Sequence, residues 1–109
     1  MKKVIGVHLF QLKPEVTAED FERFVAEEIH PAVNGPDIAL RICRGERGER
    51  LGKYVMLFEF DDVAARNRYF PGTAEPTQAA KTMISAWWDR FTRYAEIMGV
   101  FTDYVTVGA

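Results

Sequence analysis

The side chains of this sequence most suited to proton chemistry are His8, Tyr69 and His30. His8 lies in the segment Val4–Leu12, which is strand-like and largely apolar on both faces. Imidazole is the obvious side chain for moving protons near neutral pH. In apolar surroundings, however, a histidine is unfavourable unless its nitrogens find partners. His8 is therefore either an acid or base in a pocket or a hydrogen-bonded core residue, and the sequence leaves both open.

Two further positions allow both a chemical and a structural role. The phenol of Tyr69 could orient a carbonyl group or stabilise an enolate, or it could pack a short helix against the body of the protein. His30 precedes a proline at a helix end, where the helix dipole favours a protonated imidazole, so it either caps the helix or faces a pocket. Arg41 and Glu59 fall inside predicted neighbouring strands, which predicts a cross-strand ion pair in preference to substrate binding.

Residues for metal or cofactor binding are scarce. The chain has two histidines and one cysteine, Cys43, and no His-x-x-x-His pair on a predicted helix. The glycines at 45 and 48 lie in a predicted hairpin loop, not between a strand and a helix where they could cradle a phosphate. We therefore predict no metal and no cofactor. A lone cysteine cannot form an internal disulfide, which favours a reducing cytoplasm.

The overall charge argues against several partners. The formal net charge is −2, and acidic and basic residues are mixed without a basic stripe, so nucleic acid is disfavoured. No apolar run is long enough to span a bilayer, and we interpret the N-terminus as mature sequence. Aromatic residues make up 13% of the chain, which suits a core or a cavity wall because these side chains bury large areas.

The hydrophobic pattern predicts a single domain over residues 1–109. Thr17 opens a helix that ends near Pro31, and Asp61 or Asp62 caps a short helix that runs through Tyr69. A long helix from about residue 76 places Trp87 and Phe91 on its apolar stripe and ends at residue 99, a glycine suited to a C-terminal cap. The predicted strands are Val4–Leu12, Ile38–Arg44, Tyr54–Phe60 and residues 101–107.

The resulting β-α-β-β-α-β order is that of the split βαβ unit. It predicts an α+β, ferredoxin-like domain: one antiparallel sheet in the order 4-1-3-2, with both long helices on one face. The opposite face carries mostly apolar residues and needs cover, which predicts a homodimer through that face. Its predicted members are Ile5, Val7, Leu9, Val55 and Leu57.

Several stretches resemble the dimeric α/β-barrel proteins, above all the stress-responsive A/B-barrel group. They are residues 7–14 (VHLFQLKP) followed by a capped acidic helix, residues 69–71 (YFP), and residues 85–91 (SAWWDRF). Residues 28–32 (EIHPA) are similar to a His-Pro element that closes the first helix of EthD-like and NIPSNAP-like proteins. The resemblance spans nearly the whole chain as a pattern of elements.

This resemblance implies a pocket between the sheet and the helices. In the related cyclases a first-strand histidine and a tyrosine at the place of Tyr69 face that pocket, so we expect His8 and Tyr69 to be catalytic and within hydrogen-bond range of each other. The histidine that follows the tyrosine in those cyclases is absent, since residues 71–78 contain none. The expected ligand contacts are Phe10, His30, Phe58, Trp87 and Phe91.

The superfamily includes cyclases, isomerases, cofactor-free monooxygenases and haem-degrading enzymes, so the fold does not name the reaction. We expect a small cofactor-independent enzyme, of cyclase, isomerase or monooxygenase type, that acts on an apolar or aromatic carbonyl compound. The first alternative is a dimeric ligand-binding or stress-related module without turnover. A haem-binding relative is the third.

Overall fold

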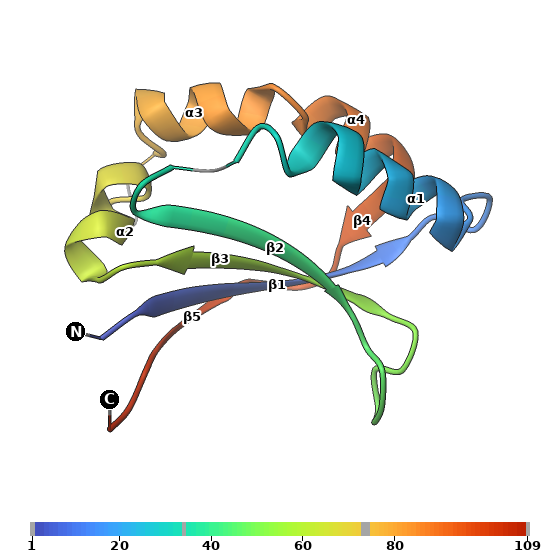
Figure 1. Cartoon of the computed structure of the whole chain (residues 1–109), viewed down its shortest axis with the longest axis horizontal. Helices are drawn as coiled ribbons and strands as arrows, with labels where there is room; N and C mark the ends of the chain where they lie inside the picture. The colour runs from blue at the N-terminus through green and yellow to red at the C-terminus, as the bar shows by residue number, and fades with distance from the viewer. Residues whose placement is uncertain (1, 34, 73–74, 109) are drawn as a thin grey trace.

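The computed structural model describes residues 2–33, 35–72 and 75–108. Within them, five antiparallel strands form one sheet, and the helices lie on one of its faces (Figure 1). The strand order is β2-β3-β1-β4, and β5 also pairs with β1. The predicted α+β class and the predicted 4-1-3-2 order are confirmed, with the last strand in two pieces. The strands are β1 Val4–Leu12, β2 Ile38–Arg44, β3 Tyr54–Phe60, β4 Ala95–Ile97 and β5 Thr102–Val105.

The first helical segment begins as predicted. Helix α1 spans Ala18–Phe24 and continues as a π-helical turn, η1, over Val25–Ile29. The Thr17 hydroxyl accepts a hydrogen bond from the Asp20 backbone N–H at 3.1 Å, which satisfies one of the free donors at the helix start. The residues that the helical spacing places on the inner face, Phe21, Phe24, Val25 and Ile29, are buried.

The second helical region differs from the prediction. The short helix α2, Val63–Tyr69, is capped by Asp62, whose Oδ1 accepts from the Ala65 N–H at 2.7 Å. The predicted single helix over residues 76–99 is wrong: α3 covers Gln78–Ser85 and α4 covers Trp88–Tyr94. Between them, Trp87 leaves the helical conformation with φ −138° and ψ −11°.

The end of that region joins the sheet. Residues 95–97 form β4 and pair with the end of β1, where Leu12 faces Ala95 and Phe10 faces Ile97. This pairing satisfies backbone groups of β1 that a longer helix would leave open at the sheet edge. Gly99, the predicted helix cap, instead has a φ of +70° in the connection from β4 to β5.

The core lies between the inner face of the sheet and the helices. Its centre is an aromatic cluster around Phe10, with ring centroids 5.6 Å from Phe21, 5.9 Å from Tyr54 and 5.2 Å from Phe91. Phe10, Phe21 and Phe91 are fully buried. Close packing of this kind holds α1 and α4 on β1 and β3 at one end of the sheet.

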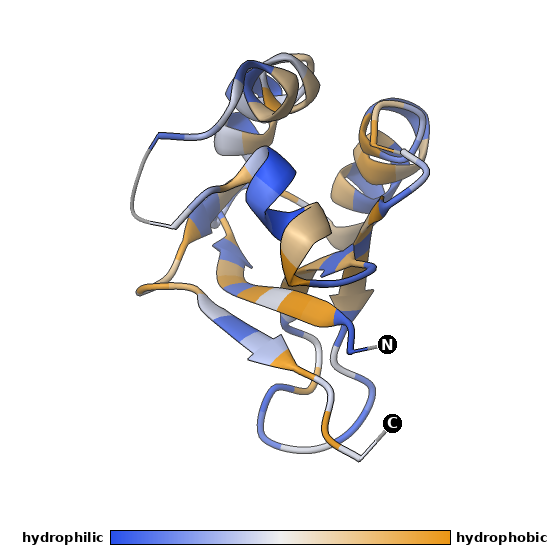
Figure 2. Cartoon of the chain, turned by 90° about the vertical axis from the view of Figure 1, so that its left-hand side faces the viewer, coloured by the Kyte–Doolittle hydropathy of each residue, from blue (hydrophilic) through white to orange (hydrophobic). Residues whose placement is uncertain are grey.

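The outer face of the sheet carries no helix (Figure 2). Leu9 and Tyr104 are 37% and 56% exposed there, and Val7 and Leu57, which face each other across β1 and β3, are half-buried. The predicted cross-strand ion pair is confirmed, because Arg41 Nε lies 2.5 Å from Glu59 Oε2.

Candidate functional site

A cavity of about 420 Å³ lies between the inner face of the sheet and the helices α2 to α4. This volume falls within the range of small-molecule sites, about 300–1,000 Å³. Its wall is largely aromatic and aliphatic, with three charged or ionisable side chains. The lining residues are Gly6, His8, Met56, Phe58, Phe60, Arg66, Phe70, Gly72, Ile84, Trp87, Trp88, Ile97, Phe101 and Asp103.

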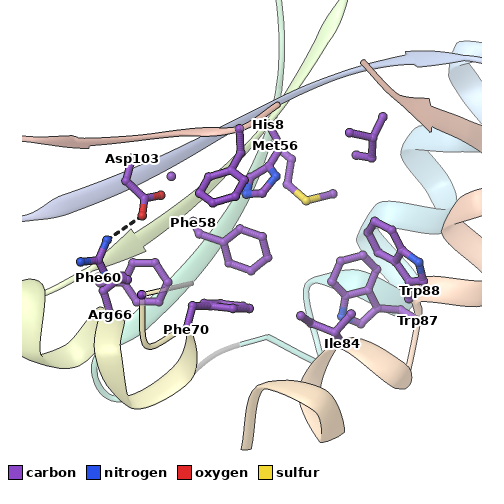
Figure 3. Close-up of a pocket in the computed structure, with 14 residues that line it drawn as sticks. His8, Met56, Phe58, Phe60, Arg66, Phe70, Ile84, Trp87, Trp88 and Asp103 are labelled. Atoms are coloured by element: carbon purple, nitrogen blue, oxygen red, sulfur yellow. Dashed lines mark hydrogen bonds and ion pairs between the residues drawn. The ribbon is translucent and has the colours of Figure 1, made fainter. Parts of the chain in front are cut away.

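The three ionisable side chains, His8, Arg66 and Asp103, form what we call the polar corner (Figure 3). Asp103 projects from β5 and Arg66 from α2, and Arg66 Nη1 donates to Asp103 Oδ2 at 2.6 Å. The two side chains are only 22% and 26% exposed, so this ion pair is less screened by water than a surface pair. It ties the helix to the last strand beside His8.

Gly6 makes the polar corner possible. It faces Asp103 across the β1–β5 pairing and lies two residues from His8 on the same side of β1. A Cβ atom at this position would lie 2.9 Å from Asp103 Oδ1 and 3.8 Å from His8 Nε2. The first distance is too short for two non-bonded heavy atoms of this kind. A glycine therefore leaves the space in which the carboxylate and the imidazole both approach the cavity.

The imidazole of His8 is held by two aromatic rings. It stacks on Phe101 with a centroid distance of 5.2 Å and meets the edge of Phe58 at 5.5 Å. Burial lowers the pKa of His8 below its ordinary value of 6.5, and the negative charge of Asp103 partly opposes this. The neutral form therefore predominates at pH 7, which is the form that can accept a proton.

Comparisons with known proteins bear on the fold. No protein-family model matches the chain, and no curated protein sequence matches it. The structure of HapK from Hahella chejuensis superposes with a TM-score of 0.64 and 18% identity over 100% of this chain and 95% of that one. A DABB family protein with a ferredoxin-like fold from Mesorhizobium loti superposes with a TM-score of 0.55 and 20% identity over 100% and 99% of the two chains. The chain has the ferredoxin-like fold. At these identities the likeness establishes the fold alone, so function must be argued from the site.

On this ferredoxin-like fold, Tyr69 is not part of the cavity wall. Its hydroxyl donates to Asp37 Oδ1 at 2.9 Å, and Arg68 Nε also donates to that carboxylate, at 3.0 Å. Burial and the hydrogen bond to Asp37 raise the pKa of the Tyr69 phenol. Because Tyr69 is the last residue of α2, its side chain reaches the segment before β2. The expected hydrogen bond between His8 and Tyr69 is not formed.

The expected ligand contacts divide into two groups. Phe58 and Trp87 line the cavity together with His8. Phe10 and Phe91 do not line it; both are packed in the aromatic cluster of the core. His30 follows η1 and lines a separate depression.

Arg66 and Asp103 were missed by sequence reasoning. Aspartate is depleted in strands, so an aspartate within a predicted strand was the available indication that Asp103 serves a site. No sequence feature indicated that Arg66 serves the site. The faces of a short polar helix carry similar side chains, so the face that meets the cavity cannot be chosen before the tertiary contacts are known. Among the residues that the structure describes, no group of three or more His, Cys, Asp or Glu side chains could hold a metal ion. In the same described ranges, no helix has the length and apolar character needed to cross a membrane.

Proposed function

We propose that the protein binds a small, mostly aromatic carbonyl compound in the cavity and that His8 removes a proton from the carbon next to the carbonyl group. The observation that carries this proposal is a neutral imidazole in an apolar cavity beside a carboxylate. Apolar walls suit an aromatic ligand, and a few converging polar groups fix its orientation. A base with a pKa below neutrality is unprotonated when the substrate arrives.

The proton balance of the step is simple. A free ring nitrogen of His8 takes the proton, and the electron pair of the C–H bond moves to the carbonyl, which becomes an enolate. If the enolate is conjugated with a double bond, return of the proton from the imidazolium to the far carbon of that system is an isomerisation. If the α-carbon instead attacks a second carbonyl of the same molecule, a ring closes, and the oxygen of that carbonyl takes the proton from the imidazolium. Asp103 lies close enough to stabilise the imidazolium formed in between, and the ion pair with Arg66 holds the Asp103 side chain in place.

Hydrogen–deuterium exchange tests the proposal without the natural substrate. The probe is 2-tetralone, a bicyclic aromatic ketone small enough for a cavity of about 420 Å³. We expect the protein to bind it and to accelerate exchange of its C1 protons in D₂O at neutral pH, followed by proton NMR. Binding without accelerated exchange would favour the second candidate, a ligand-binding module in which His8 only packs between Phe58 and Phe101. Absence of binding would contradict both.

We also propose that two copies pair through the outer face of the sheet. The support is that this face carries mostly apolar side chains, several of them exposed. No helix covers it (Figure 2). Obligate dimers bury such surfaces, and a two-fold axis would bring the same strands of each copy together.

A charge at the centre of that face should separate the copies. We expect the wild-type protein to show twice the chain mass of 12.5 kDa in light scattering at micromolar concentration. Leu57→Lys, opposite Val7 on the outer face, should shift the mass to that of one chain, because a buried unpaired ammonium is strongly unfavourable. The control is Glu46→Lys in the exposed β2–β3 loop. A wild-type mass of one chain would contradict the dimer.

The location in the cell remains a proposal that rests on Cys43. It forms no disulfide within the chain. A cysteine without a disulfide partner is most compatible with a reducing compartment, so we propose the cytoplasm.

A further inference from the structure

One oxygen of the Asp103 carboxylate has no hydrogen-bond partner within the polar corner. Oδ2 accepts the hydrogen bond from Arg66 Nη1, whereas no donor among the described residues reaches Oδ1. The Asp103 side chain lines the cavity and is only 26% exposed, so a ligand that fills the cavity displaces water from this oxygen. A charged acceptor that loses water without gaining a donor is strongly unfavourable. A ligand that supplies the donor itself avoids this cost.

Oδ1 and the imidazole of His8 lie on either side of the same space over Gly6. A Cβ atom on Gly6 would lie 2.9 Å from Asp103 Oδ1 and 3.8 Å from His8 Nε2. Because position 6 carries no side chain, atoms of a ligand can approach both groups there. Figure 3 shows Arg66 and His8 on different sides of the carboxylate, so the ion pair leaves the side toward His8 open. A ligand whose acidic carbon meets His8 therefore brings a group beside that carbon close to Oδ1.

We infer that Asp103 Oδ1 accepts a hydrogen bond from a hydroxyl or N–H group that the ligand carries beside the carbon that loses its proton. This inference rests on the proposed function and narrows its substrate class to aromatic carbonyl compounds with a hydrogen-bond donor at that place. Asp103 then has two roles: its charge stabilises the imidazolium, and its free oxygen selects the ligand by direct contact.

Two pairs of probes test the inference on the wild-type protein alone. In 8-hydroxy-2-tetralone a donor lies beside C1, and in 8-fluoro-2-tetralone an atom of similar size that cannot donate replaces it. Because hydrogen bonds to charged groups are the stronger ones, we expect the hydroxyl probe to bind about 10- to 100-fold more tightly in calorimetric titrations. The 5-hydroxy and 5-fluoro compounds carry the same groups away from C1, and their Kd values should differ by less than about 3-fold.

Asp103→Asn tests the contact at the residue itself. The guanidinium of Arg66 can only donate, so it keeps the amide oxygen at the place of Oδ2 and leaves the amide NH₂ at the place of Oδ1. A neutral donor then faces the ligand hydroxyl, and the preference for 8-hydroxy over 8-fluoro should fall by about 5- to 10-fold. The matched control is Asp89→Asn, which removes the same charge from an exposed position on α4 outside the cavity and should keep the wild-type preference.

Exchange of the 2-tetralone C1 protons by the wild-type protein separates the inference from the proposed function. If 2-tetralone binds and exchanges, but the hydroxyl preference at position 8 is absent or persists in folded Asp103→Asn, the inference is overturned and the proposed function stands. If the preference follows Asp103 but no probe exchanges, the donor site is supported and the proton transfer is contradicted. If none of the probes binds, both fail.

Discussion

Replacing His8 with glutamine should return the exchange of the 2-tetralone C1 protons to the rate in buffer. General base catalysis by a placed side chain is worth about 100- to 10,000-fold, and glutamine retains polarity and approximate size without a basic nitrogen. His8 is the imidazole that lines the cavity, where its pKa keeps it neutral. The rate is measured by proton NMR in D₂O at a probe concentration that saturates the wild-type protein.

The second histidine of the chain supplies the matched control. His30 lies outside the cavity, so His30→Gln should exchange the probe at the wild-type rate. His8→Gln should still bind 2-tetralone, because the aromatic wall is intact. Wild-type exchange in His8→Gln would exclude His8 as the base, even if the cavity binds the probe.

The pH dependence of exchange follows from the same geometry. Because burial lowers the pKa of His8, the rate should rise with pH, reach half its maximum below pH 6.5, and be level at neutral pH. Asp103→Asn removes the charge that stabilises the imidazolium, so its half-maximum should lie at a lower pH than in the wild-type protein. A shift to higher pH would contradict the assigned role of Asp103.

Much of the fold was predictable because local patterns agreed with the tertiary structure. Thr17 and Asp62 are cap residues followed by helical spacing, and both make the expected hydrogen bonds. The alternation along Tyr54–Phe60 places its odd and even residues on opposite faces of the sheet, as its burial shows. Element order then limits the topology to a few arrangements.

The long helix was not predictable from the same information. Residues 78–94 keep a helical pattern through Trp87, and nothing local indicates the break there. Residues 95–97 are also compatible with helix, but they pair with the exposed edge of β1. That choice depends on a partner strand far away in sequence: Phe10 and Ile97, which pair, are 87 residues apart.

The residues of the candidate site also divide into those that local sequence patterns predict and those that depend on tertiary contacts. Parity in β1 and β3 and the stripe of the last helical region place His8, Phe58 and Trp87 at the cavity. Gly6 and Asp103 depend instead on the register between β1 and β5, which sets them opposite each other. The reason for a glycine at position 6 follows only from the structure, in which a Cβ atom there would lie 2.9 Å from Asp103 Oδ1.

Phe10→Ala should destabilise the protein by about 3–5 kcal/mol, a large part of the roughly 5–15 kcal/mol that holds a typical domain folded. Phe10 is fully buried and contacts Phe21, Tyr54 and Phe91, so its removal leaves a void at the centre of the aromatic cluster. Urea unfolding measures the loss. Leu51→Ala is the control, since Leu51 is 64% exposed and its truncation should change the unfolding free energy by no more than about 0.5 kcal/mol.

The same variant tests the core position of Phe10 against its expected role as a ligand contact. As a core residue, Phe10 should affect stability, while the folded fraction of Phe10→Ala still binds 2-tetralone with near wild-type affinity. As a ligand contact, it would show the reverse: a small change in unfolding free energy and a large loss of binding. The second pattern would mean that the cavity extends past Met56 toward α1. The packing of Phe10 against Phe21 leaves no such space, because their ring centroids lie 5.6 Å apart.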